Sequence, residues 1–592
     1  MISSNVDQQY HLDVIESLKQ PQKRSMGLEL EALAASQPDK TAIKYEKRLI
    51  TYDQFNRMSN RYSNLFIKLG LKRGDIVAIM MANRPEYLAA VAGLSKVGII
   101  ATLINIELRG EVLAYGINID ATRSIILGHE YLELFKTIKE RVRLLSPAQT
   151  FIETEEQSLD IPANYVNLNA LLADCSEENP ATTGDIDSND YLAYLFASGV
   201  TGKRKAVPLT HKRWITTGHQ ICLNCGIDNN TIQYISSPLY LNSGFHFCFS
   251  GAIISASTMV LKKSFSATKF WDDIRQEKAD FFVGVGEAYR YLLLQPEKPD
   301  DKNHNLRIAI SNGIRPELVQ PFRERFGVSH LIEMYGKTEN VGFLINSQEI
   351  PGMLGNLTLN GIRQGEAASY DDDNGEVVRD TSGWVKKCNP GETGILLCEI
   401  NELNPFEGYI NDPESSAKKI LTDVFKLGDR YFITGDLVEL HKDDYVSFVL
   451  RLGNTYRWKG KTVSADSVAD VLDKFYGGIE ETVVYGVVVP GMEGRTGMAA
   501  IKVMEGETLD MKRLAEHINR RMPPHARPNF IRVCERTLAD LELQEKKTIF
   551  QLQEYNPFLI DDPLYYYDEQ QETYLPLTRE IYQAIIESKI EF

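Results

Sequence analysis

The chain has few cysteines and no surplus of basic residues. Its seven cysteines are dispersed over 592 residues, a distribution typical of reduced thiols in a cytoplasmic protein rather than of a disulfide framework. Acidic residues outnumber basic ones, 81 to 65, which gives a formal net charge of −16. Because nonspecific nucleic-acid binding requires a basic surface, this charge argues against nucleic acid as a partner.

The chain also lacks a long uninterrupted apolar run. The most apolar stretch, residues 87–106, is interrupted by Lys96 and contains Gly93 and Gly98, whereas a transmembrane helix needs about 20 mostly apolar residues. This stretch is typical of a buried helix that leads into a strand. The first ten residues are polar and do not have the basic-then-apolar pattern of a secretory signal. We therefore expect a cytoplasmic protein without a transmembrane span.

Length and periodicity predict an α/β protein with more than one domain. A chain of 592 residues exceeds what one hydrophobic core usually serves. Short β-branched runs alternate with helical stretches, which indicates βαβ units and mostly parallel sheets. After residue 450 the pattern restarts in smaller units of strands and helices. We expect a large N-terminal domain over residues 1–450 and a small α+β domain over residues 451–592.

A turn rich in hydroxyls and glycines follows the apolar run at residues 191–196. Its members are Ser198, Gly199, Thr201 and Gly202, and Lys205 follows shortly after. Glycines let backbone N–H groups approach phosphate oxygens, hydroxyls donate further hydrogen bonds, and lysine supplies a point charge. The turn is not a Walker loop, because no Gly-Lys-Ser/Thr closes it. Taken alone it is a weak signal that an ordinary surface turn could also produce.

This turn resembles the phosphate loop of the adenylate-forming superfamily, which comprises acyl-CoA synthetases, luciferases and peptide-synthetase adenylation domains. Residues 335–339 (Tyr-Gly-Lys-Thr-Glu) resemble its Tyr-Gly-x-Thr-Glu segment, and residues 434–436 resemble its Thr-Gly-Asp motif. Arg451 stands where the superfamily has a second ribose ligand. Each segment alone could be a turn with a solvated charge. Four segments in the required order make coincidence improbable.

Further segments narrow the resemblance to one branch, the fatty acid transport proteins or very-long-chain acyl-CoA synthetases. Residues 451–460 (Arg-Leu-Gly-Asn-Thr-Tyr-Arg-Trp-Lys-Gly) are similar to the Arg-x-Gly-Asp-Thr-Phe-Arg-Trp-Lys-Gly signature of this branch. Other segments with the same likeness lie at residues 286–292, 307–316, 406–409 and 484–499. The likeness extends from about Glu29 to the C-terminus.

The resemblance implies a site for ATP and Mg²⁺. It assigns three catalytic groups, Lys205, Thr338 on the α-phosphate, and Glu339 as the metal ligand, a role that suits a hard carboxylate oxygen. In the superfamily a small C-terminal domain rotates on a hinge, which here would lie near Gly453. The nucleotide-binding residues that the resemblance implies are Ser198, Gly199, Thr201, Gly202, Asn312, Gly313, Tyr335, Gly336, Asp436, Arg451, Lys459 and Gly460.

Two successive reactions follow from the resemblance. The carboxylate of a long-chain or very-long-chain fatty acid attacks the α-phosphate of ATP to give acyl-AMP and pyrophosphate, and the thiol of CoA then displaces AMP. Tyr240, Phe245 and residues 286–287 fall near the acyl tunnel that the resemblance implies. Peripheral membrane contact stays open, because such acids partition into lipid. Neither the length of the acyl chain nor the oligomeric state follows from the sequence.

One departure from the branch pattern concerns the essential lysine of the small domain. A count without gaps from residues 527–528 forward, or from residues 555–557 backward, places that lysine on Gln544. Glutamine carries no charge and cannot neutralise a developing phosphate charge as ammonium does. A neighbouring lysine, Lys546 or Lys547, could take its place.

Three alternatives therefore stay open. We prefer a fatty acid–CoA ligase, because most members of the resembling branch are ligases. The second alternative is an adenylate-forming enzyme that uses an acceptor other than CoA. The third is a nucleotide- or acyl-binding homologue with impaired catalysis.

Overall fold

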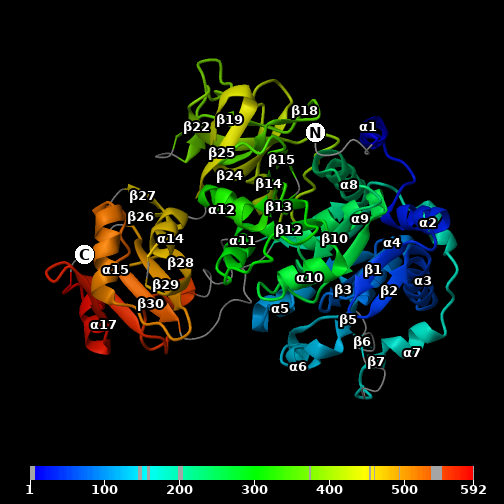
Figure 1. The fold of residues 1–592 in the computed structure, drawn as a ribbon, viewed down its shortest axis with the longest axis horizontal. Helices are drawn as coiled ribbons and strands as arrows, with labels where there is room; N and C mark the ends of the chain where they lie inside the picture. Colours follow the sequence, from blue (N-terminus) through cyan, green and yellow to red (C-terminus); the bar gives the residue numbers. More distant parts are fainter. Residues whose placement is uncertain are drawn as a thin grey trace. The chain divides into compact units, whose positions relative to one another are not determined.

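The computed structural model describes residues 7–144, 150–155, 161–197, 205–339, 341–371, 375–452, 455–458, 461–475, 477–492, 494–534, 550–590 and 592. They form two compact units (Figure 1). The described part of the first unit lies within Met1–Ala197, Arg204–Thr434 and Glu439–Phe448, and that of the second lies within Gly435–Val438 and Val449–Phe592.

The first unit contains an eight-stranded sheet in the order β15-β14-β13-β12-β10-β11-β1-β2. The six strands from β14 to β1 are mutually parallel, and both edge strands are antiparallel to their neighbours. The strands are β1 (Thr41–Tyr45), β2 (Arg48–Thr51), β10 (Ile232–Ile235), β11 (Thr258–Leu261), β12 (Phe281–Val285), β13 (Ile308–Asn312), β14 (His330–Tyr335) and β15 (Leu344–Ile345).

A second, seven-stranded sheet has the order β7-β6-β5-β3-β4-β8-β9. It is parallel except for the antiparallel pair β8 and β9. Its strands are β3 (Ile76–Met80), β4 (Ile100–Leu103), β5 (Thr122–Gly128), β6 (Thr150–Glu153), β7 (Val166–Asn167), β8 (Tyr191–Ala197) and β9 (Lys205–Thr210). Two parallel-rich sheets with intervening helices confirm the α/β fold class that the sequence predicts.

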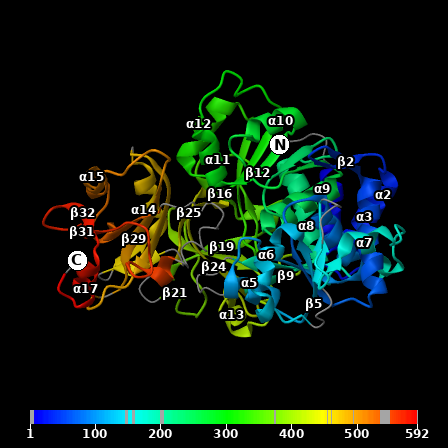
Figure 2. The same cartoon turned by 90° about the horizontal axis from the view of Figure 1, so that it is seen from below.

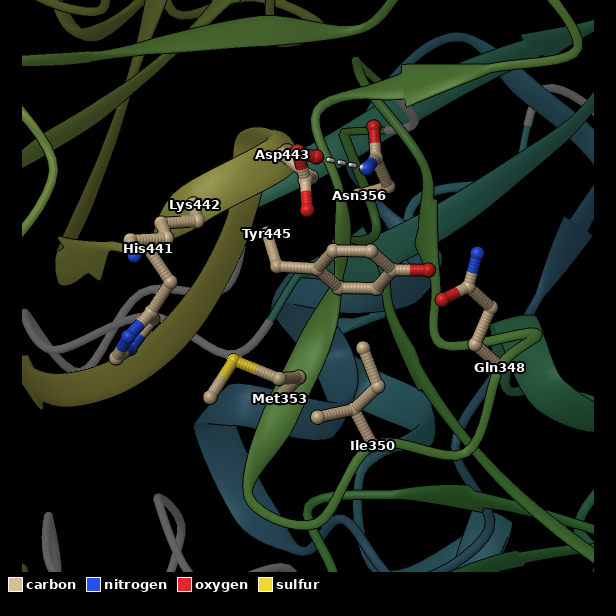
Figure 3. A pocket seen from close by; sticks show the side chains of 8 residues that line it. All are labelled: Gln348, Ile350, Met353, Asn356, His441, Lys442, Asp443 and Tyr445. Atoms are coloured by element: carbon tan, nitrogen blue, oxygen red, sulfur yellow. Dashed lines mark hydrogen bonds between the residues drawn. The ribbon is translucent and has the colours of Figure 1, made fainter.

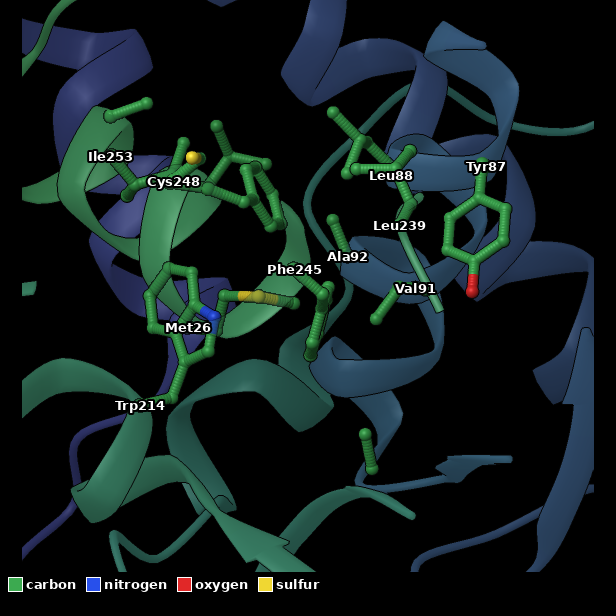
Figure 4. Packing of buried hydrophobic residues seen from close by; sticks show 14 of the residues in the cluster. Met26, Tyr87, Leu88, Val91, Ala92, Trp214, Leu239, Phe245, Cys248 and Ile253 are labelled. Carbon is green, nitrogen blue, oxygen red and sulfur yellow. The ribbon is translucent and has the colours of Figure 1, made fainter. Parts of the chain in front are cut away.

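One hydrophobic core joins both sheets of the first unit. It contains Ile310 and Ile332 of the first sheet, Val77 and Leu103 of the second, and buried side chains of the helices between them. Figures 1 and 2 both show α2 beside α3, and Figure 4 shows part of the core packing. The helices that contribute include α2 (Met26–Ser36), α3 (Tyr52–Lys68), α4 (Pro85–Val97), α8 (His211–Cys225) and α9 (Ser250–Ser255).

The stretch at residues 87–106 forms the expected buried helix and strand. Helix α4 begins at Pro85 and ends before Gly98, whose φ of 75° lies in the left-handed region that favours glycine. Lys96 is fully buried, and its Nζ donates to the side-chain oxygens of Asn56 and Asn60. No described helix combines the length and the apolar composition that crossing a membrane requires.

Further helices of the first unit are α1 (Gln8–Ser17), α5 (Gly110–Ile117), α6 (Leu132–Lys136), α7 (Leu168–Ala173), α10 (Phe270–Glu277), α11 (Gly286–Leu293), α12 (Pro316–Phe326), α13 (Pro413–Ala417) and the π-helix η4 (Asn242–Phe249). Of these, α1, α7 and η4 also contribute buried side chains to the core that joins the two sheets. Short 3₁₀ turns of the chain are η1 (His129–Tyr131), η2 (Lys139–Arg141), η3 (Ala181–Asp185), η5 (Lys442–Asp444) and η7 (Pro524–Ala526).

A third sheet is built from residues 353–451. Its order is β16-β25-β24-β22-β19, with β23 paired to β24. The strands are β16 (Met353–Asn356), β19 (Gly365–Ala368), β22 (Thr393–Glu399), β23 (Ile420–Thr422), β24 (Arg430–Leu440) and β25 (Tyr445–Arg451). Two small hairpins accompany it, β17 (Thr358–Leu359) with β18 (Ile362–Arg363) and β20 (Tyr370–Asp371) with β21 (Glu376–Val377).

The second unit is a small α+β structure, as the restarted sequence pattern predicts. Successive residues of a strand face opposite sides of a sheet. The strands of this unit therefore contribute to two hydrophobic clusters. Tyr485 and Met498 pack in one cluster, and Val484 and Ala499 pack in the other. Its helices and strands are β26 (Thr455–Trp458), β27 (Lys461–Ser464), α14 (Ala465–Asp473), β28 (Ile479–Val487), β29 (Thr496–Val503), α15 (Met511–Arg521), β30 (Phe530–Cys534), β31 (Leu564–Asp568), β32 (Thr573–Pro576) and α17 (Arg579–Ile586).

Candidate functional site

Several of the residues predicted for nucleotide binding follow two neighbouring strands of the first sheet. Asn312 ends β13, and Tyr335 ends β14. These strands are parallel, with Ile310 opposite Ile332, so the segments that follow them leave the same edge of the sheet. Ligands of open parallel sheets bind at this carboxyl edge. The fold therefore brings Asn312 and Gly313 to the same edge as residues 335–339.

A partly buried carboxylate, that of Glu333, fixes the turn at Gly313. The backbone N–H of Gly313 donates to Glu333 Oε1 at 2.5 Å, and that of Ile314 donates to Glu333 Oε2 at 3.3 Å. Gly313 has a φ of 84°, which favours glycine. A Cβ on Gly286 would lie only 2.0 Å from the carbonyl oxygen of Gly313. The turn is thus held by the carboxylate of Glu333 and by close contact with the backbone at Gly286.

Burial raises the pKa of Glu333 to about 8, although the two backbone N–H donors act in the opposite direction. We did not predict Glu333 from the sequence. A single acidic residue inside an otherwise apolar strand, His330-Leu-Ile-Glu-Met-Tyr335, is the signal that could have revealed it, because an unpaired buried carboxylate is costly.

Tyr409 connects two of the predicted catalytic residues. Its hydroxyl donates to Glu339 Oε1 at 2.8 Å, and the ammonium of Lys205 lies 4.7 Å from the centroid of its ring. Tyr409 is buried. The next residue, Ile410, donates its backbone N–H to the carbonyl oxygen of Ala206 at 2.9 Å, which joins this segment to β9. Lys205 and Glu339, 134 residues apart, therefore share one neighbour.

The two predicted ribose ligands form an ion pair. Arg451 Nε donates to Asp436 Oδ1 at 2.6 Å, and Nη2 donates to Oδ2 at 3.3 Å. The pair spans the adjacent strands β24 and β25. The side chain of Asp436 is completely buried, whereas that of Arg451 is about one third exposed. This two-bonded geometry fixes the orientation of the carboxylate next to a permanent cation.

Within the first unit, Lys337 supports the segment that carries Thr338 and Glu339. Its Nζ donates to the backbone carbonyl oxygen of Thr434 at 2.7 Å. Residues 335–339 are thereby tied to the strand that leads into the Thr-Gly-Asp motif.

The other predicted residues lie outside the described part of the chain. They are Ser198, Gly199, Thr201, Gly202, Lys459, Gly460 and Gln544, together with Gly453, Lys546 and Lys547. Their proposed roles stay predictions.

Phe245 and Tyr240, expected near an acyl tunnel, are both buried. Phe245 lies on the π-helix η4 and packs in the main core with Leu239 and Trp214 (Figure 4). A Cβ on Gly244 would approach the carbonyl oxygen of Pro238 within 2.5 Å, so the π-helix lies directly against the preceding turn. Such helices are rare and occur frequently at functional sites.

A pocket of about 580 Å³ lies elsewhere, beside β16 and the turn between β24 and β25. Figure 3 shows the ring of Tyr445 in its middle. None of the predicted site residues lines it. The lining residues are Gln348, Ile350, Met353, Asn356, His441, Lys442, Asp443 and Tyr445.

The carboxylate of Glu339 suits Mg²⁺ that is bound together with a phosphate ligand. Among the described residues, no three or more His, Cys, Asp or Glu side chains come together in a group that could hold a metal ion. Mg²⁺ needs no such cage, because it is usually bound by one or two carboxylates plus substrate phosphates and water. A single fixed carboxylate, Glu339, fits this mode.

Comparisons with known proteins identify the family and the fold. The profile of the AMP-binding enzyme family matches residues 30–408. Long-chain fatty acid transport protein 2 of Rattus norvegicus is 33% identical over 562 residues, which cover 94% of this chain and 90% of that protein. The medium/long-chain-fatty-acid–CoA ligase FadD6 of Mycobacterium tuberculosis is 34% identical over 556 residues, with coverages of 94% and 90%.

Solved structures share the fold. The crystal structure of the anthranilate CoA ligase AuaEII in complex with anthranoyl-AMP matches with a TM-score of 0.71 at 20% identity, over 89% of this chain and 96% of that one.

Proposed function

The chain belongs to the AMP-binding enzyme family, and from that membership we propose that it is a fatty acid–CoA ligase. It activates a long-chain or very-long-chain fatty acid as acyl-AMP with ATP, and transfers the acyl group to CoA. The observation that carries the proposal is the contact of Tyr409 with both Lys205 and Glu339, because a cation and a carboxylate at one point are what a metal-bound triphosphate requires.

In the first step one carboxylate oxygen of the fatty acid attacks the α-phosphorus of ATP and pyrophosphate leaves. Catalysis of such a displacement consists of positioning and charge neutralisation. We assign the α-phosphate to Thr338 and to the loop at residues 198–202, and a phosphate charge to Lys205. Glu339 would hold Mg²⁺, which neutralises phosphate charge when bound.

The nucleoside is assigned to the strand ends. Tyr335 stacks on the adenine, and Gly336 and the turn of Asn312 and Gly313 line it. Asp436 accepts the ribose hydroxyls, and Arg451 supports this carboxylate through the ion pair. Lys459 and Gly460 are assigned to nucleotide binding as well.

In the second step the thiol of CoA attacks the acyl carbonyl and expels AMP. We propose that the small domain, residues 451–592, rotates on a hinge near Gly453 between the two steps, so that one site serves both. The large domain then comprises residues 1–450. A cytoplasmic location is part of the same proposal, and so is peripheral membrane contact, which the lipid character of the proposed substrate supports.

The test is acyl-CoA formation by the purified protein with ATP, Mg²⁺, CoA and saturated acids of increasing length. Each buried methylene contributes about 0.8 kcal/mol, so kcat/KM should rise with chain length until the acyl site is full. A preference for acetate or an aromatic acid over palmitate-length acids would show the substrate assignment to be wrong.

Lys205→Met offers a sharper check of the site. Removal of this cation should lower the rate on the order of a hundredfold. Lys262→Met is the matched control, because Lys262 also lies over a tyrosine ring, that of Tyr234 at 5.9 Å, but outside the site. Equal losses in both variants would contradict the role of Lys205.

A second candidate function rests on Gln544. This position carries no cation. The alternatives to a CoA ligase are therefore an adenylate-forming enzyme with a different acceptor and a protein that binds nucleotide without turnover. Pyrophosphate release beyond one equivalent per protein, measured with and without CoA, separates them: continued release that depends on CoA indicates the ligase, continued release that is independent of CoA indicates another acceptor, and no release at all indicates a binding protein.

A further inference from the structure

The fold holds Tyr409 in place from several directions. Its backbone N–H donates to Ser416 Oγ at 2.8 Å, and Ser416 Oγ itself donates to the carbonyl oxygen of Asp412 at 2.7 Å. Its ring meets that of Phe406 edge-on, with centroids 5.5 Å apart. The preceding Gly408 has a φ of 84°, a conformation that other residues rarely adopt. The aromatic ring is thus positioned by its own segment.

The hydroxyl of Tyr409 acts on Glu339. Its bond to Oε1 at 2.8 Å engages one of the two carboxylate oxygens and fixes the rotation of the carboxylate. The phenol is the donor in this bond, because an ionised carboxylate oxygen can only accept.

The ring of Tyr409 acts on Lys205. An ammonium group 4.7 Å from the ring centroid lies within the range of cation–π attraction. Lys205 begins β9 directly after the predicted phosphate loop. The ring restricts where this flexible side chain places its charge.

We propose that Tyr409 is a positioning residue of the site: its hydroxyl orients the carboxylate of Glu339 for metal binding, and its ring holds Lys205 beside it. The inference rests on the proposed function and deepens it. It assigns two separable effects on ATP binding to the side chain of Tyr409. The effect of the hydroxyl depends on the metal, and the effect of the ring does not.

The chain contains a matched control for this arrangement. Tyr234 on β10 is also buried, its hydroxyl donates to Asp273 Oδ2 at 2.9 Å, and Lys262 Nζ lies 5.9 Å from its ring centroid. No predicted site residue belongs to this group. Tyr234→Phe therefore removes the same kind of hydrogen bond with the same kind of neighbours, but away from the site.

The test is calorimetric titration of the full-length protein with ATP, once with excess Mg²⁺ and once with EDTA. Wild type should bind ATP more tightly with Mg²⁺. Tyr409→Phe should lose most of this advantage, with Mg·ATP bound five- to tenfold more weakly, while its affinity in EDTA changes less than twofold. Tyr409→Leu, which also lacks the ring, should bind at least threefold more weakly in EDTA. Tyr234→Phe should match wild type in both buffers.

Two results would overturn the inference. Wild-type affinity of Tyr409→Phe for Mg·ATP would show that the hydroxyl does not orient the metal ligand, while leaving the proposed function intact. A wild-type protein that binds ATP in neither buffer would contradict the proposed function and this inference together. Thermal melting of each variant establishes that it is folded before titration.

Discussion

At the scale of single residues, Glu333 couples protonation to stability. Its pKa is raised by burial to about 8 in the folded chain, against about 4.3 for an exposed glutamate. Between these values the folded state binds a proton that the unfolded state has lost. The stabilising contribution is therefore fully present below about pH 4 and is lost as pH rises through 8.

Glu333→Gln should remove this dependence, because an amide is neutral at every pH and its oxygen can still accept from Gly313. We expect the melting temperature of the variant to increase relative to that of wild type as pH rises from 5 to 9. The increase should correspond to at least about 1 kcal/mol in the free energy of unfolding. Glu287→Gln is the control. It replaces a half-exposed, ion-paired carboxylate on the neighbouring helix α11, and its melting temperature should change with pH in parallel with that of wild type. A constant difference between Glu333→Gln and wild type would contradict the coupling.

Residues with local signals could be predicted from the sequence, and residues that act through distant partners could not. Asp436, Arg451 and Glu339 were predicted as chemical groups in short motifs. The partners of Glu333 and Tyr409 lie 20 and 70 residues away, and no spacing along the chain indicates that they meet.

At the scale of elements, the N-terminal helix α1 is attached to α8 by a pair of histidines. His11 Nδ1 lies 2.7 Å from His219 Nδ1, both rings being buried. One nitrogen must donate and the other accept, so the two imidazoles cannot both be protonated. Burial lowers the pKa of His11, and lowers that of His219 to about 2, with the charges of His11 and Arg24 acting in the same direction. Asp7 opposes the shift of His11.

Acid should release this helix before it unfolds the rest. A depressed pKa means that the docked pair stabilises fully above pH 6.5 and loses this contribution as pH falls. Amide hydrogen exchange of residues 8–17, corrected for intrinsic rates, should show a protection factor at least tenfold lower at pH 5 than at pH 7.5. Residues 52–68 of α3 serve as the internal control.

His219→Gln provides the comparison. It should weaken the pH dependence of the protection of residues 8–17, because His11 is then the only histidine of the pair that titrates. Equal protection of wild type at the two pH values would contradict the account of this interface.

Elements with a clear apolar pattern were predicted, whereas their ends and the π-helix were not. Helix α14 begins at Ala465, because the side chain of Ser464 caps it by accepting from the backbone N–H of Ser467. The π-helix η4 depends on contact between Gly244 and Pro238. Contacts of that kind arise in the tertiary fold and leave no periodicity to read.

At the scale of the whole molecule, Gln544 decides how complete the catalytic machinery is. If the small domain closes over the phosphates during adenylation, Gln544→Lys should supply a cation there and raise the single-turnover rate of acyl-AMP formation severalfold or more. Lys546→Ala and Lys547→Ala are measured in parallel. An already fast wild type that is slowed in one of these two variants shows that the neighbouring lysine has taken over the charge. An inactive wild type that Gln544→Lys does not improve favours a binding protein.

The central claim is that the chain makes acyl-AMP and passes the acyl group to CoA. Its most direct test mixes excess protein with palmitate, ATP and Mg²⁺, quantifies protein-bound products by mass spectrometry, and then adds CoA. The account predicts palmitoyl-AMP in the first stage, and its conversion to palmitoyl-CoA and AMP in the second. Absence of palmitoyl-AMP and of palmitoyl-CoA from protein that binds ATP would contradict it.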